Sequence, residues 1–133
     1  ENLSRSKRIM NASEQHVKQL TAIGFLAVGQ GLNAEGEAIF NGLKVYRPDS
    51  EYPLIGLALN HIGSRRHDAA LSILTGQALK INPASAIAKC FVGLTLKLAG
   101  RAPESERWLK EVVATADDRD AKALAENLLS EAA

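Results

Sequence analysis

Residues 24–31, Gly-Phe-Leu-Ala-Val-Gly-Gln-Gly, have two counterparts further along the chain. These are residues 56–63, Gly-Leu-Ala-Leu-Asn-His-Ile-Gly, and residues 93–100, Gly-Leu-Thr-Leu-Lys-Leu-Ala-Gly. In each stretch two glycines seven residues apart enclose an apolar run of helical spacing, and a second helical run follows. The first glycine lets a neighbouring backbone approach closely, and the second can adopt the left-handed conformation that ends a helix. The pattern therefore predicts three units, each made of a helix, a tight turn and a second helix.

Prolines mark the other end of the repeat. Pro48 and Pro83 each follow a second helical run, and they lie 35 residues apart. A proline stops one helix and can open the next, and a helical period in the mid-thirties is typical of tetratricopeptide repeats. We therefore predict an all-α fold, a right-handed α-solenoid of about three tetratricopeptide-like helical hairpins. The expected parts are repeats at about 17–50, 51–85 and 86–118 and a capping helix at 119–132.

The apolar periodicity predicts seven helices and no strands, in a single domain at residues 13–133 that follows a flexible N-terminal segment at residues 1–12. The expected helices lie at about 13–30, 34–46, 51–62, 67–81, 84–99, 103–115 and 119–131. The middle repeat departs from the pattern, because its second helix runs about three residues long before Pro83. We expect a degenerate repeat there.

The composition limits the classes of function. Sixteen Lys and Arg against fifteen Asp and Glu leave a net charge of +1, so no strong field attracts nucleic acid or an anionic membrane. No apolar run approaches the roughly 18–20 residues that span a bilayer, so we expect no membrane insertion. Cys90 is the only cysteine, which rules out an intramolecular disulfide and favours a reducing, cytoplasmic location.

No pattern of catalytic or metal-binding residues is present in the sequence. The chain lacks HExxH, CxxC, GxSxG and phosphate-binding glycine motifs, and its three acidic residues at 117, 118 and 120 do not form a calcium loop. Cys90 has no histidine at helical spacing from it. We therefore expect no enzyme activity, no metal and no cofactor. An enzyme would require His61 and Cys90 to converge on one pocket.

The first helices of such an array line its concave side, where solenoids hold peptides. The repeat register puts Phe25, Leu57 and Leu94 at one equivalent, inward position, which suits an amphipathic helix or an apolar peptide. The remaining inward positions of the predicted protein-binding groove are Thr21, Val28, Asn60, His61, Cys90, Lys97 and Leu98. An alternative is that this row is covered by the chain's own termini or by a second copy.

Two stretches resemble a known family. They are residues 42–48, Gly-Leu-Lys-Val-Tyr-Arg-Pro, and residues 66–71, Arg-His-Asp-Ala-Ala-Leu, which follows a glycine turn. With them, the segment from Val17 to about Ala116 resembles the small tetratricopeptide-like chaperones of bacterial type III secretion systems.

The resemblance implies a cytoplasmic protein that binds the amphipathic helix of a secreted subunit. One branch of the family holds the needle subunit, usually with a small helical co-chaperone, and the other holds translocator proteins. The short chain and the apolar row are nearer to the needle branch, whereas the long second helix of the middle repeat departs from its pattern. The alternative function is a generic scaffold or adaptor that binds proteins or forms a homodimer.

Overall fold

A computed structural model describes the backbone of residues 2–131 and the side chains of residues 14–131. Within this part of the chain there are seven helical stretches and no strand, as the sequence predicts. Residues 67–81 count as one stretch, although they comprise three consecutive helical elements. The elements are α1 (Asn2–Gly29), α2 (Asn33–Tyr46), α3 (Tyr52–Gly63), α4 (His67–Ile73), η1 (Leu74–Ala78), α5 (Leu79–Ile81), α6 (Ala86–Leu98), α7 (Ala102–Thr115) and α8 (Arg119–Ser130).

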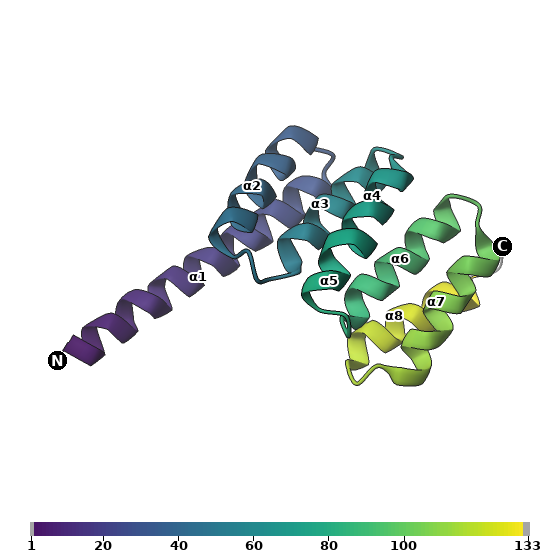
Figure 1. The fold of residues 1–133 in the computed structure, drawn as a ribbon. Coiled ribbons are helices and arrows are strands. Elements are labelled where there is room, and N and C mark those ends of the chain that lie inside the picture. Colours follow the sequence, from purple (N-terminus) through teal and green to yellow (C-terminus); the bar gives the residue numbers. More distant parts are fainter. Residues whose placement is uncertain (1, 132–133) are drawn as a thin grey trace.

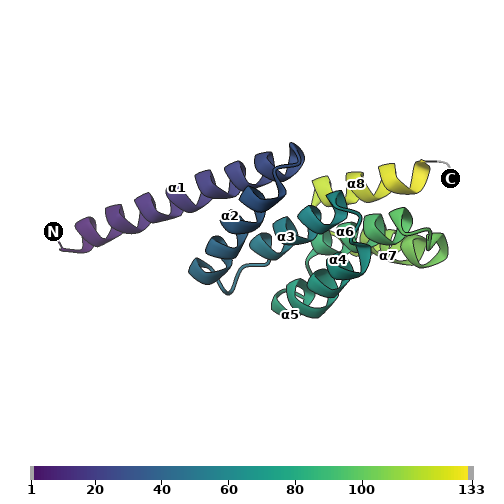
Figure 2. The same ribbon diagram turned by 90° about the horizontal axis from the view of Figure 1, so that it is seen from above.

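The helices form three antiparallel pairs and a final single helix (Figure 1). The pairs are α1 with α2, α3 with the stretch from α4 to α5, and α6 with α7. Each first helix after α1 also packs against the second helix of the preceding pair, and α8 packs against both α6 and α7. Seen from above, α1 and α8 lie along one side of the molecule, and α4, α5 and α7 lie on the other (Figure 2). This arrangement confirms the array of tetratricopeptide-like hairpins.

The glycines inside the first helices are sites of close contact. A Cβ added at Gly24 would lie 2.8 Å from the Phe40 ring, and one added at Gly56 would overlap the same ring. Phe40 is completely buried between these two helices. In the third pair, a Cβ at Gly93 would lie 2.5 Å from Leu109. The small residue in each first helix therefore makes room for a large side chain from a second helix.

The tight turns follow one geometry in all three pairs. Gly31 and Gly100 have φ angles of +77° and +80°, as expected of glycines that end a helix. The expectation for Gly63 is wrong, because α3 includes Gly63 and the left-handed residue is Arg65, with φ of +61°. The next amide, Arg66 N–H, donates to the His61 carbonyl at 2.8 Å, and the other two turns have the equivalent bond. Two extra residues thus precede the turn of the middle repeat.

The irregular second helix of the middle repeat contains a π-helical segment. The predicted helix at 67–81 is continuous, and η1 over Leu74–Ala78 takes up its additional length. Leu74 and Ala78 are both fully buried, whereas the three residues between them are exposed. The wider turn therefore moves the surplus residues to the surface while the residues on either side remain in the core.

The first helix is longer than the sequence predicts. It begins at Asn2 rather than at residue 13, and its N-terminal part extends beyond the rest of the array (Figure 1). Residues 2–12, predicted as a flexible segment, continue this helix because they contain no glycine or proline to end it. Residue 1 lies outside the described residues, as do residues 132 and 133, so the end predicted for the capping helix is not described.

The contact between Gly56 and Phe40 gives a prediction for stability. We expect Gly56→Ala to lower the free energy of unfolding by about 2 kcal/mol, because the ring has no room to withdraw. Gly42→Ala is the matched control, since Gly42 lies in α2 with open space around it. It should raise stability by about 0.5–1 kcal/mol. Urea unfolding followed by circular dichroism measures both, and a neutral Gly56→Ala would contradict the packing described.

The left-handed Arg65 gives a second prediction. Arg65→Gly should stabilise the chain by about 1 kcal/mol, because glycine adopts this conformation without the cost that a Cβ imposes. Arg66→Gly is the control, since Arg66 has an ordinary φ of −97° and its replacement should not stabilise. Thermal unfolding of the two variants should separate them, and equal melting temperatures would refute the assignment of strain to Arg65.

Candidate functional site

The three apolar residues of the predicted row pack mainly into the core. The Phe25 ring is half-buried and lies edge-to-face against Phe40, with 4.8 Å between ring centroids. Leu57 is buried, and Leu94 is partly buried against the second core cluster, around α6, α7 and α8. Val28 is partly buried, and its side chain is close to Gly36 of α2. These residues therefore offer a partner only the edges of their side chains.

Helix α8 covers Cys90, one of the inward positions of the third repeat. Cys90 is completely buried, and its Sγ donates a hydrogen bond to the Ala121 carbonyl at 3.2 Å. Burial, with Asp118 nearby, raises the pKa of the thiol to about 11. The expectation that Cys90 lines an open groove is therefore wrong, because α8 occupies the place that the first helix of a fourth pair would take.

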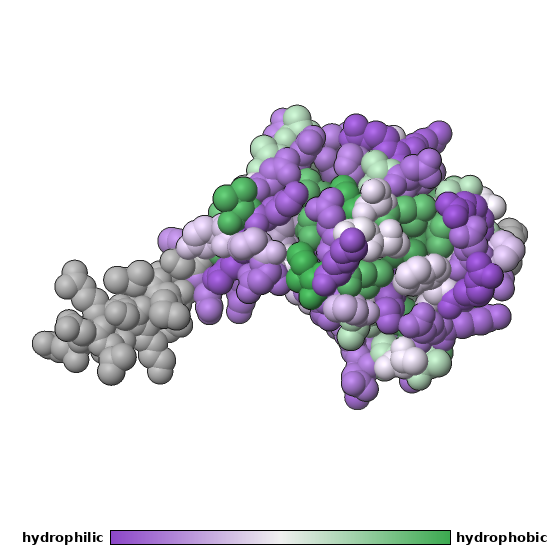
Figure 3. All heavy atoms as spheres, viewed as in Figure 1, coloured by the Kyte–Doolittle hydropathy of each residue, from purple (hydrophilic) through white to green (hydrophobic). Residues whose placement is uncertain are grey.

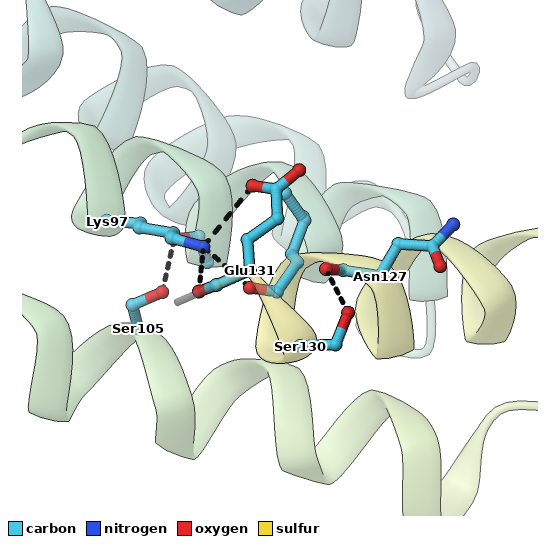
Figure 4. Close-up of polar contacts among 7 residues, drawn as sticks. Lys97, Ser105, Asn127, Ser130 and Glu131 are labelled. Atoms are coloured by element: carbon cyan, nitrogen blue, oxygen red, sulfur yellow. Dashed lines mark hydrogen bonds and ion pairs between the residues drawn. The ribbon is translucent and has the colours of Figure 1, made fainter. Parts of the chain in front are cut away.

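Lys97 of α6 binds the end of α8 (Figure 4). Its Nζ donates to the Leu128 carbonyl at 2.7 Å and to the Glu131 carbonyl at 3.3 Å, and it pairs with the Glu131 carboxylate at 3.4 Å. A cation at the carbonyl end of a helix satisfies carbonyls that have no partner within the helix. In the same view Ser105 of α7 lies beside α6, and its Oγ donates to the Gly93 carbonyl at 2.6 Å. The Lys97 bonds thus join α6 to α8, and the Ser105 bond joins α7 to α6.

Two of the polar groove residues on α1 and α3 donate hydrogen bonds to backbone carbonyls. Thr21 Oγ1 donates to the Val17 carbonyl of its own helix at 2.7 Å. Asn60 is buried, and its Nδ2 donates to the Asn33 carbonyl at 3.0 Å, which ties α3 to the start of α2. His61 is partly buried, and desolvation, together with the charge of Arg66, lowers its pKa. Of the ten predicted groove residues, Leu98 is the most open, with 54% of its surface exposed.

The described residues form no cluster of metal-binding side chains. No group of three His, Cys, Asp or Glu side chains that could hold a metal ion occurs among them. The raised pKa of Cys90 keeps its thiol protonated, which is the opposite of what a nucleophile needs. His61 and Cys90 have different neighbours. The charged groups that act on His61 are Arg66 and Glu37, whereas Cys90 lies under α8. Over residues 2–131, no helix combines the length and apolarity needed to cross a membrane.

An apolar surface that the sequence analysis did not identify lies on α1. We call it the α1 stripe, and it consists of Leu20, Ile23 and Leu26. Ile23 is 51% exposed, whereas its equivalents in the next two repeats, Ile55 and Val92, are 2% and 1% exposed. Leu26 is 60% exposed, and its equivalents at positions 58 and 95 are fully buried. The second helix of the preceding pair packs against α3 and against α6, and among the described residues no helix packs against α1 in the same way.

A hollow adjoins the α1 stripe between α1 and α2. It has a volume of about 400 Å³. Its lining is formed by His16, Val17, Leu20, Ala38, Ile39, Gly42, Leu43 and Tyr46. Apolar side chains are also visible at the surface of α2 beside the extended part of α1 (Figure 3). The repeat register contained the signal for this surface, because Leu20 and Ile23 occupy interface positions of the first repeat that the structure describes.

Comparisons with known proteins identify the fold. No protein family and no curated protein sequence matches the chain. Among solved structures, the type III secretion translocator chaperone SycD of Yersinia enterocolitica matches with a TM-score of 0.74 and 17% identity over 92% of both chains. TTC0263, a thermophilic tetratricopeptide protein of Thermus thermophilus, matches with a TM-score of 0.71 and 21% identity over 93% of this chain and 71% of its own. MamA matches at 0.62, with 17% identity over 92% and 74%.

The cover that α8 places over Cys90 can be measured directly, because the chain has no other thiol. Lys97→Met should speed the reaction of Cys90 with a thiol reagent by about tenfold, since lost hydrogen bonds worth about 1.4 kcal/mol would let α8 open more often. Leu98→Met, on the neighbouring exposed residue, is the control and should not change the rate. If the Lys97→Met rate matches the wild-type rate, Lys97 does not hold α8 in place.

Proposed function

We propose that this chain is a protein-binding chaperone of a type III secretion system, which holds an apolar helical segment of an exported needle or translocator subunit. The observation that supports it most is the match to SycD, in which each chain covers 92% of the other. A solenoid of helix pairs presents a long surface that can bind a peptide without chemistry. A chaperone that receives a subunit before export acts in the cytoplasm.

The proposed binding site for the exported segment is the side of the molecule where α1 and α8 flank α3 and α6 (Figure 2). Leu98 and the partly exposed Phe25, Val28 and Leu94 would contact the apolar face of the bound helix. Lys97 and His61 are partly exposed beside them. An apolar anchor on such a surface contributes about 2 kcal/mol to binding.

The second candidate function is that of a scaffold or adaptor that binds a protein unrelated to secretion, or a second copy of itself. The α1 stripe favours this candidate, because it leaves three large apolar side chains exposed outside the proposed groove. A small helical co-chaperone is the corresponding partner if the protein serves secretion.

Leu98→Asp tests the proposed groove most cleanly. Leu98 is exposed, so the variant should keep the helical circular dichroism of the wild type, whereas Phe25→Asp would also disturb the packing on Phe40. Binding is measured by titration with peptides that carry the terminal helices of needle and translocator subunits from the same organism. We expect Leu98→Asp to weaken binding by at least about tenfold.

Ile81→Asp is the control for this experiment, because Ile81 is an exposed apolar residue on α5. It should bind the peptides as the wild type does. Equal binding by Leu98→Asp and the wild type would remove the groove from the proposal. Failure of every secretion peptide to bind the wild-type chain would favour the adaptor function.

A further inference from the structure

We infer that Arg47 and Lys18 bind a carboxylate side chain of the exported segment, beside a hollow that receives a neighbouring apolar side chain of the same segment. This site rests on the proposed function and adds to it a sequence feature that the bound segment must have. Three observations support it, namely the place of the hollow, the charge of its lining and a comparison of the first two repeats.

The hollow lies between α1, the end of α2 and the start of α3, and its volume is about 330 Å³. We call it the Arg47 hollow. Thr21 lines it and lies one helical turn before Phe25 on α1, so the hollow adjoins the proposed groove. A volume of this size accommodates an apolar side chain with a small polar group beside it. The apolar part of its lining comes from Val17, Leu43, Tyr52 and Pro53.

The charged residues that line the Arg47 hollow are both cations. They are Lys18 and Arg47, and neither belongs to an ion pair among the described residues. Long basic side chains line apolar surfaces with their methylene groups and keep their charged ends in water, which places the two charges at the opening. The Arg47 guanidinium lies over the Tyr46 ring, 5.6 Å from its centroid, and stacking of this kind leaves the N–H groups at the guanidinium edge free to donate.

The carboxylates of the adjoining elements do not line the Arg47 hollow. Glu14 lies one turn before Lys18 on α1, but the two form no ion pair. Glu51 accepts a hydrogen bond from Asn82 Nδ2 at 2.6 Å. The other acidic residues of these elements are Asp49, which is exposed in the loop after α2, and Glu35 and Glu37, which lie at the opposite end of α2. The lining therefore has positive charge, and an acidic group complements it.

The second repeat has a carboxylate at the place that is neutral in the first. Arg47 and Asn82 are equivalent, because each follows the last residue of a second helix and precedes a proline. Gln19 and Glu51 are equivalent, because each lies five residues before the glycine of its first helix. Glu51 binds Asn82, whereas the first repeat combines a charged donor with a neutral glutamine. A carboxylate from the bound segment would supply the acceptor that Glu51 provides in the second repeat.

The experiment uses the full chain and two small probes. Isocaproate is a leucine-like side chain that carries a carboxylate, and isocaproamide is its neutral counterpart. Backbone amide shifts in NMR spectra measure the affinity of each probe and identify the residues near it. We expect isocaproate to bind at least about tenfold more tightly than isocaproamide, because it forms charge-assisted hydrogen bonds. The largest shifts should occur at Ser50, Glu51 and Tyr52.

Four variants locate the carboxylate. Arg47→Gln and Lys18→Gln should each reduce the preference for isocaproate by at least about threefold, because each removes one of the two charged donors. Lys44→Gln is the matched control, since it removes the same charge from an exposed position of α2 outside the hollow. It should leave the preference unchanged. Gln19→Glu should weaken isocaproate by supplying a competing carboxylate. If Arg47→Gln loses helical circular dichroism, Lys18→Gln gives the result, since Lys18 is exposed.

A double-mutant cycle extends the test to the exported segment. Each acidic residue of a secretion peptide that binds the wild-type chain would be replaced by its amide, one at a time. We expect one replacement to weaken binding to the wild type by at least about tenfold and to have little effect on binding to Arg47→Gln. The coupling would identify the carboxylate that Arg47 binds.

Three outcomes would overturn the inference. Equal affinities of the two probes, or shifts confined to residues outside the Arg47 hollow, would refute the carboxylate site. If every acidic residue of the peptide can be replaced without loss, the site does not select the segment, even where Leu98→Asp still abolishes binding. If isocaproate binds in the hollow but no secretion peptide binds the wild type, the proposed function fails and the exported segment is not the partner of this site.

Discussion

The ring of Phe40 between Gly24 and Gly56 is the contact on which the rest of the structure depends. It joins three helices, because Phe40 belongs to α2 while the two glycines belong to α1 and α3. Close packing of this kind fixes the distance between helix axes, since any side chain on either glycine would push the helices apart. Leu109 against Gly93 repeats the contact within the third pair. The spacing of α1, α2 and α3, and that of α6 and α7, therefore follows from glycines in first helices and large residues in second helices.

Much of this fold could be predicted because each of its rules acts locally. The glycine pairs and the two prolines each recur once per helix pair along the sequence, and this recurrence predicts the seven helical stretches. The exceptions have physical causes. Arg65 takes the left-handed position because the middle repeat has two more residues before its turn, and arginine gives no sign of that conformation. The polarity of residues 2–12 indicated a flexible segment, whereas their lack of glycine and proline allows α1 to continue through them.

The site was harder to predict than the fold, because burial depends on which helices are neighbours. The register placed Cys90 and Lys97 on the inward side of α6, and the structure shows that the predicted capping helix, α8, buries Cys90 and binds Lys97. The same limitation hid the α1 stripe. Leu20 and Ile23 belong to the repeat pattern, and they are exposed because no helix among the described residues packs over them. Within the described residues, α8 thus covers one end of the array, whereas the first helix has an exposed apolar surface.

Thiol labelling at three equivalent positions tests this difference between the ends most directly. Single cysteines would replace Ile23, Ile55 and Val92 in a chain in which Cys90 is alanine, and their reaction with a maleimide would be timed under native conditions. The account predicts rapid labelling at position 23 and labelling at least about a hundredfold slower at positions 55 and 92, where exposure requires opening of the packed helices. Protection at position 23 equal to that at position 55 would contradict it, because the α1 stripe would then already be covered.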